Sequence, residues 1–161
     1  MPFKVFLSYS FDPAEQALAW RLQTLAAANG IEMYVPSRGL ASAHVARSPA
    51  SEVQSAMDRS DCVLAIIAGR TDPAVQRELK YAYDTKKRVI PIVEKDLAGL
   101  PLLTQFPKVF HFSIRGYPGN LESEVVDYLR QEKVAKEQRQ AIGALVGVGI
   151  GLLVLSSLSE K

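Results

Sequence analysis

The sequence contains very little cysteine and histidine. Its 161 residues include one cysteine, Cys62, and two histidines, His44 and His111, which lie far apart. A lone cysteine excludes an internal disulfide framework and fits a reducing, cytosolic compartment. So few cysteines and histidines leave no zinc-ligand cluster, and we expect no metal. Because Cys62 lies within an apolar run, we expect a buried, reduced thiol.

The chain also lacks an excess of either charge. Its formal net charge is +2, which gives no indication of nucleic acid as a partner. Hydrophobic residues make up 48% and charged residues 22% of the sequence, as in globular rather than disordered proteins. The length is sufficient for one domain with its own core.

Several nucleotide-binding and phosphate-accepting signatures are missing. No glycine-rich loop ends in Lys-Ser or Lys-Thr, as nucleoside triphosphate sites require. Ala68-Gly69 occupies the place where a phosphate-accepting receiver domain needs an aspartate. Gly147–Gly151 (GVGIG) imitates a dinucleotide fingerprint, but it follows no predicted strand and has no acidic residue at the required spacing.

Apolar runs alternate with amphipathic stretches. Strands are predicted at Phe3–Ser8, Ile31–Val35, Asp61–Ala68, Arg88–Glu94 and Val109–Ser113. Helices are predicted at Pro13–Asn29, Ala50–Arg59, Pro73–Lys86 and Leu121–Gln140. This alternation predicts an α/β fold, with an open, mostly parallel, five-stranded sheet that has helices on both faces.

Local signals mark some boundaries of these elements. Asp12 is a candidate N-cap, with Pro13 at the first helical position, and Gly30 is placed to end that helix. Pro91 within the fourth strand indicates an edge strand or an irregularity.

Ligands of such sheets bind beyond the carboxyl ends of the strands. Of the loops at this edge, 36–49 is basic: it holds Arg38, His44 and Arg47 and no acidic residue. It could bind a pyrophosphate, or it could be an ordinary solvated loop. Gly39 could be its hinge or a turn glycine.

One carboxylate stands out on the third predicted helix. At 100° per residue, Val75, Leu79 and Ala82 share the stripe that faces the sheet, and Glu78 falls beside it. No basic residue lies three or four positions away, so no helical ion pair accounts for Glu78. Glu78 is therefore a functional candidate, unless its head group simply reaches water.

Four stretches resemble the Toll/interleukin receptor (TIR) domain family, of bacterial type. They are KVFLSYSFD, GIEMYVPSRG, EVQSAMDRSDCVLAII and VQRELKYAYDTKKRVIPI, and the resemblance extends from about Lys4 to Val93. The first resembles the first box of that family, a strand ending in F-x-S-Y-S followed by an acidic residue, and the last resembles its W-x-x-E-L region. Ala74 stands where many members carry tryptophan. We expect Trp20, the only tryptophan, to lie in the core.

The resemblance implies a flavodoxin-like sheet and one of two activities. Some TIR domains cleave or cyclise NAD+ with a glutamate that corresponds to Glu78, whereas others only assemble with like domains. For an enzyme, NAD+ is the substrate and no further cofactor is expected. The resemblance also implies immune or stress signalling, such as antiphage defence, with activation by self-assembly. The expected substrate-binding residues are Ser8, Tyr9, Ser10, Phe11, Arg38, Gly39, His44 and Arg47.

Other interpretations stay open. The hydroxyls of the segment from Ser8 to Asp12 could bind a ligand or satisfy the loop backbone and cap the helix. The chain could be a non-catalytic assembly module, or an enzyme that resembles deoxyribosyltransferases and also uses a carboxylate at the strand ends.

The C-terminal segment Ala141–Leu158 carries no charge, which predicts a single transmembrane helix. Gly143, Gly147 and Gly151 recur every four residues, which favours close packing between membrane helices. Basic residues upstream predict that the N-terminal domain is cytoplasmic. The predicted organisation is a domain over 1–128, a charged helical connector over 129–140 and the membrane helix over 141–158. The alternatives are a helix buried in an oligomer and a tail that itself disrupts membranes.

Overall fold

The computed structural model describes residues 2–10, 12–36, 49–68, 73–97, 106, 108–113 and 120–159, with side chains as far as residue 140. The chain forms two compact units, Met1–Asp127 and Tyr128–Lys161. Helix α4 (Leu121–Ser159) begins in the first unit and continues through the second. The sheet and the candidate site belong to the first unit.

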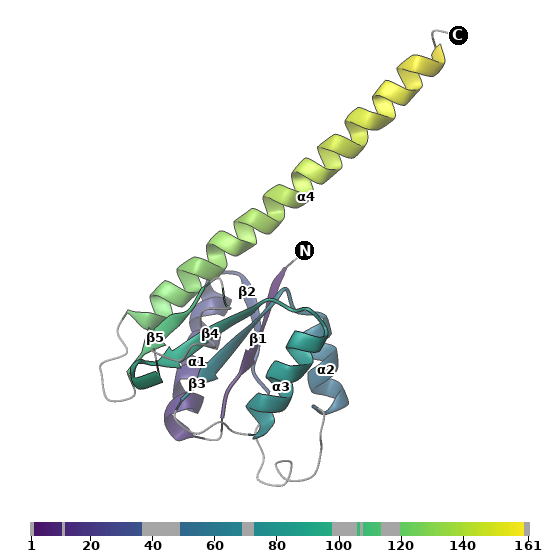
Figure 1. Ribbon diagram of the computed structural model, residues 1–161. Coiled ribbons are helices and arrows are strands. Elements are labelled where there is room, and N and C mark those ends of the chain that lie inside the picture. Colours follow the sequence, from purple (N-terminus) through teal and green to yellow (C-terminus); the bar gives the residue numbers. More distant parts are fainter. Residues whose placement is uncertain are drawn as a thin grey trace. The chain divides into compact units, whose positions relative to one another are not determined.

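A five-stranded sheet organises the first unit, and every strand pairing in it is parallel (Figure 1). The strand order is β2-β1-β3-β4-β5. The strands are β1 (Phe3–Ser8), β2 (Ile31–Tyr34), β3 (Cys62–Ile67), β4 (Val89–Glu94) and β5 (Phe110–Phe112). The predicted α/β fold is confirmed, and each predicted strand is present to within one residue at either end.

Helices lie on both faces of the sheet (Figure 1). They are α1 (Pro13–Ala28), α2 (Ser51–Asp58), α3 (Pro73–Asp84) and the beginning of α4, and a 3-10 turn, η2, covers Lys95–Leu97. Helices α2 and α3 pack on the face that carries Phe6 and Val63, where Met57 and Ala82 join the same core cluster. On α1, Arg21 Nε donates to Glu122 Oε1 at 2.8 Å, which ties this helix to the first turn of α4.

Strand β3 lies in the middle of the sheet, between β1 and β4. All of its residues except Ile67 are buried, as the continuous apolar run predicts for a strand covered on both faces. Cys62 begins this strand and is buried as a free thiol, which confirms that prediction.

The interpretation of Pro91 as a sign of an edge strand is wrong, because β4 lies between β3 and β5. The Val63 N–H donates to the Arg88 carbonyl, so the bonding groups of alternate β4 residues point toward β3. Arg88 and every second residue after it face β3 in this way. Pro91 is three positions after Arg88, so its nitrogen faces β5 instead. Pairing with β5 begins only at Ile92, so the missing N–H of proline breaks no ladder bond there.

Helix α1 begins and ends where the sequence predicts. Asp12 is the N-cap, and its Oδ1 accepts the Ala14 N–H at 2.8 Å. Gly30 follows the helix with a φ of 71°, a left-handed conformation that glycine adopts without steric cost.

The prediction that Trp20 lies in the core is wrong, because 64% of its surface is exposed. The buried stripe of α1 consists of Glu15, Leu18, Ala19, Leu22 and Ala26. Trp20 lies about 100° around the helix from Ala19 and about 160° from Leu22, which places it on the outer surface.

Within the part of the chain whose side chains are described, no helix is long and apolar enough to cross a membrane. The predicted membrane segment, 141–158, lies outside that part and stays a prediction. Its backbone continues helix α4 without a break.

Candidate functional site

The candidate site is formed where strand β1 ends beside helix α3. Ser8 is the last residue of β1, and Glu78 lies in the second turn of α3. The Ser8 hydroxyl donates a hydrogen bond of 2.7 Å to Glu78 Oε1, although the two residues are 70 positions apart in the sequence. Because α3 follows the carboxyl end of β3, which neighbours β1, the pair lies at the ligand-binding edge of the sheet.

Both members of this pair are buried. Ser8 is 0% exposed and Glu78 is 2% exposed. The alternative in which the Glu78 head group reaches water is therefore wrong. A buried carboxylate carries a desolvation penalty of several kcal/mol unless it is hydrogen-bonded, and the Ser8 hydroxyl offsets part of this penalty. A carboxylate kept at such a place is a strong functional candidate.

The next residue of the same turn is held by the chain that follows β2. The Tyr9 hydroxyl donates to the Pro36 carbonyl, and the Tyr9 ring is buried. Pro36 is the last described residue before segment 37–48. Tyr9, predicted to bind substrate, thus has a structural partner at the carboxyl end of β2.

Ser10 is held by a carboxylate of helix α1. Its hydroxyl donates to Glu15 Oε2, and its backbone N–H donates to Glu15 Oε1 at 3.4 Å. The Ser10 hydroxyl oxygen in turn accepts the Asp12 N–H at 3.2 Å. Ser10, also predicted to bind substrate, is therefore part of an internal network that continues into the helix cap.

Sequence analysis missed Glu15, which is only 3% exposed. A signal for it was present, because Glu15 lies three, four and seven positions before the buried Leu18, Ala19 and Leu22. It is also three positions after the N-cap Asp12, the spacing of a capping box. The structure thus adds a second buried carboxylate beside the same β1–α1 turn.

The remaining predicted site residues, Phe11, Arg38, Gly39, His44 and Arg47, lie outside the described residues. The structure therefore brings together Ser8 and Glu78, and places Tyr9 and Ser10 in the adjoining turn. Among the described side chains, no group of three or more His, Cys, Asp or Glu residues is placed to hold a metal ion.

Two cavities lined by described residues border strand β2. One, of about 730 Å³, includes Gln23 and Thr24 of α1, and the other, of about 260 Å³, includes Tyr34 and Arg59. Glu78 lines neither of these two cavities.

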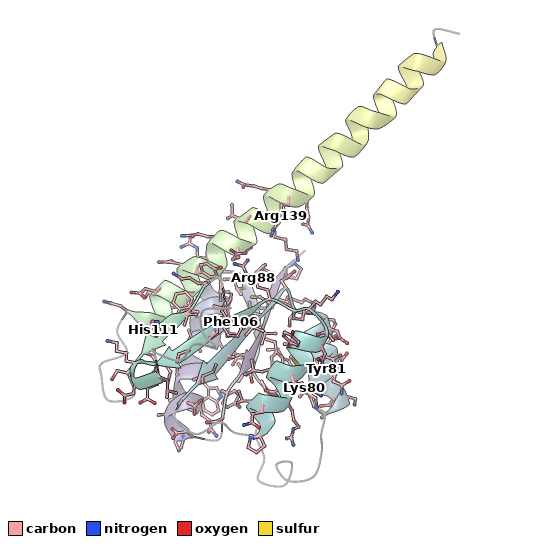
Figure 2. The ribbon with its side chains drawn as sticks, in the orientation of Figure 1. Lys80, Tyr81, Arg88, Phe106, His111 and Arg139 are labelled. Carbon is pink, nitrogen blue, oxygen red and sulfur yellow. The ribbon has the colours of Figure 1, made fainter. Side chains whose placement is uncertain are left out.

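The far end of α3 is tied to α2. The Tyr81 hydroxyl donates to Asp58 Oδ1 at 2.8 Å, and Figure 2 labels Tyr81 on the part of α3 beside α2. This hydrogen bond, with smaller contributions from desolvation and the Asp58 charge, raises the pKa of Tyr81 above its ordinary value. Lys87 Nζ donates to the Asp58 and Ser60 carbonyls at 2.9 and 2.8 Å. These bonds help to hold the helix that carries Glu78.

Neither a protein-family model nor a curated protein matches this chain. Among solved structures, a CMP N-glycosidase of Clostridium botulinum, BcmB, is similar with a TM-score of 0.49 and 16% identity. That alignment covers 80% of this chain and 98% of BcmB. The TIR domains of the activated Roq1 resistosome, which directly recognises the pathogen effector XopQ, are similar with a TM-score of 0.46 and 14% identity. This second alignment covers 86% of this chain and 76% of the other.

Both TM-scores are below 0.5 and both identities are below 25%, so these similarities carry no argument about function.

Proposed function

We propose that this chain cleaves the N-glycosidic bond between nicotinamide and ribose in NAD+, with Glu78 as the catalytic carboxylate. The observation that carries the proposal is the buried hydrogen bond between Ser8 and Glu78 at the carboxyl edge of the sheet. The resemblance of residues Lys4–Val93 to TIR domains points to the same glutamate.

The chemistry requires little more than a well-placed negative charge. Nicotinamide is cationic within NAD+ and leaves as a neutral molecule, so its departure needs no general acid. The ribose then develops oxocarbenium character in the transition state. A carboxylate fixed near the ribose stabilises this positive charge and accepts hydrogen bonds from the ribose hydroxyls. Water then attacks the ribose carbon to give ADP-ribose and a proton, or the adenine ring attacks it to give a cyclic product.

Ser8 supports this role by orienting the carboxylate. Its donated hydrogen bond holds one oxygen of Glu78, so that the carboxylate is already oriented when positive charge develops on the ribose. The basic segment that follows β2 would supply the contacts to the phosphates. Arg38, His44 and Arg47 are the proposed residues for those contacts.

The test is NAD+ consumption by the detergent-purified full chain at high protein concentration, followed by chromatography. The proposal predicts one nicotinamide released for each NAD+ lost, together with ADP-ribose or a cyclic product. CMP, the compound in the name of the similar Clostridium botulinum enzyme, is tested in a parallel assay as an alternative substrate. Release of cytosine from CMP with no loss of NAD+ would show that the substrate is CMP and not NAD+.

A non-catalytic assembly module is the second candidate. The observation that favours it is Ala74, which stands in the first turn of α3 where many TIR domains carry tryptophan. Under this hypothesis the full chain forms assemblies and leaves both NAD+ and CMP intact. The turnover assay separates the two candidates, because both can self-associate and only the enzyme consumes NAD+.

Membrane anchoring, self-association and a role in immune or stress signalling belong to the proposal as well. The uncharged segment 141–158 supports an anchor, with the N-terminal domain in the cytoplasm. Extraction of membranes with high salt and with alkaline carbonate tests this: an anchored chain stays in the pellet and a peripheral chain is released. Retained NAD+ turnover after deletion of 141–161 would argue against a tail that acts alone by disturbing membranes.

A further inference from the structure

Three consecutive residues of the β1–α1 turn are each bound to a different part of the fold. Ser8 donates to Glu78 on α3, Tyr9 donates to the Pro36 carbonyl after β2, and Ser10 donates to Glu15 on α1. The positions of Ser8, Tyr9 and Ser10 are therefore fixed from three directions. Because the turn leaves the carboxyl end of β1, it lies where a ligand of such a sheet binds.

Glu15 contacts Ser10, and capping of helix α1 does not require this contact. In a capping box, the glutamate three positions after the N-cap reaches back to the N-cap N–H. Here Glu15 extends past Asp12 and accepts both the hydroxyl and the backbone N–H of Ser10. Asp12 caps α1 separately, through the Ala14 N–H. The buried carboxylate of Glu15 thus holds the turn rather than only the helix end.

We infer that Glu15 is a positioning residue of the proposed NAD+ site, acting through Ser10 to hold the β1–α1 turn in its substrate-binding position. This inference rests on the proposed function. Glu15 is placed to act on the turn and not on Glu78 itself, so its removal weakens substrate binding.

The experiment measures KM and kcat for NAD+ in the full chain and in Glu15→Ala, Ser10→Ala and the double variant. We expect each single variant to raise KM about 10-fold and to change kcat less than about threefold. The double variant should resemble Glu15→Ala, because removal of the Glu15 carboxylate already removes both of its contacts with Ser10. Glu15→Gln keeps an acceptor for the Ser10 N–H and should restore KM to within about threefold of the original.

Glu52→Ala is the matched control. Glu52 is also a first-turn glutamate, on α2, but it is exposed. Its replacement should leave both KM and kcat unchanged.

A merely structural Glu15 would lower the folded, active fraction, so that kcat falls while KM stays constant, and this result would overturn the inference. Additive effects of the two substitutions would overturn it as well. If Glu15→Ala does not fold, Ser10→Ala decides: an unchanged KM contradicts the inference. Absence of turnover in the unsubstituted chain is a separate result, which removes the proposed function and this inference with it.

Discussion

The Ser8 hydroxyl and Glu78 Oε1 lie 2.7 Å apart and form a buried hydrogen bond between the end of β1 and the second turn of α3. The bond joins two elements that are not consecutive in the chain. It places a carboxylate, which an ordinary helix would turn toward solvent, at the ligand-binding edge of the sheet.

Ser8→Ala should destabilise the fold by about 1–3 kcal/mol, because the buried Glu78 carboxylate loses a donor. Thermal unfolding of the detergent-purified chain, followed by far-ultraviolet circular dichroism, measures the change. The double variant Ser8→Ala with Glu78→Met should recover the loss, since replacing both polar partners by apolar groups is close to neutral or stabilising. A double variant less stable than Ser8→Ala would contradict this account of the pair.

The Arg21–Glu122 ion pair should stabilise the first unit, because Glu122 is largely buried and its contact with Arg21 Nε is only 2.8 Å. Arg21→Met should lower the free energy of unfolding by about 1–3 kcal/mol. The Lys4–Glu32 pair is the control, since it is 3.9 Å long and exposed on both sides. Lys4→Met should change the same quantity by less than about 0.5 kcal/mol. Equal effects of the two substitutions would show that burial does not set the strength of these pairs.

Tyr81 should titrate at higher pH in the unsubstituted chain than in Asp58→Asn, because the Asp58 carboxylate accepts a hydrogen bond from the protonated hydroxyl and so raises the pKa of Tyr81. A raised pKa in the folded state means that the contact contributes stability below pH 10 and loses it as the pH rises through that pKa. Phenolate absorbance in an alkaline titration, with Tyr81→Phe to assign the signal, measures the shift. Identical curves with and without Asp58 would contradict the contact.

Trp20→Ser should change the free energy of unfolding by less than about 0.5 kcal/mol, because Trp20 is 64% exposed. As Trp20 is the only tryptophan, its fluorescence reports on this site alone. Iodide should quench that fluorescence readily in the folded chain. Weak quenching, or a large loss of stability, would indicate a partner that covers α1.

The elements of the fold could be predicted because each one carries its own local signal. The apolar run of β3, the Asp12-Pro13 start of α1 and the left-handed Gly30 are all set by neighbours in the sequence. Pro91 was misinterpreted because its effect depends on which strand its nitrogen faces, and that depends on the pairing with β5. Trp20 is exposed, contrary to the prediction, because its angular position on α1 lies away from the stripe that includes Leu18 and Leu22.

The candidate site could be predicted only in part. The helical position of Glu78 beside the stripe of Val75 and Ala82 was enough to single it out. Its bond to Ser8 could not be predicted, since strand order and helix packing bring those residues together. Glu15 was missed because an acidic residue in the first turn of a helix is common for electrostatic reasons alone. Only the structure distinguishes that role from a buried carboxylate that binds Ser10.

The central claim is that Glu78 is a catalytic carboxylate, and nicotinamide release from NAD+ by three purified full-length chains tests it most directly. These are the unsubstituted chain, Glu78→Gln and the matched control Asp84→Asn, which removes an exposed carboxylate at the end of the same helix. The account predicts release by the first and third, and a rate at least about 100-fold lower for Glu78→Gln. Equal release by all three chains would contradict it.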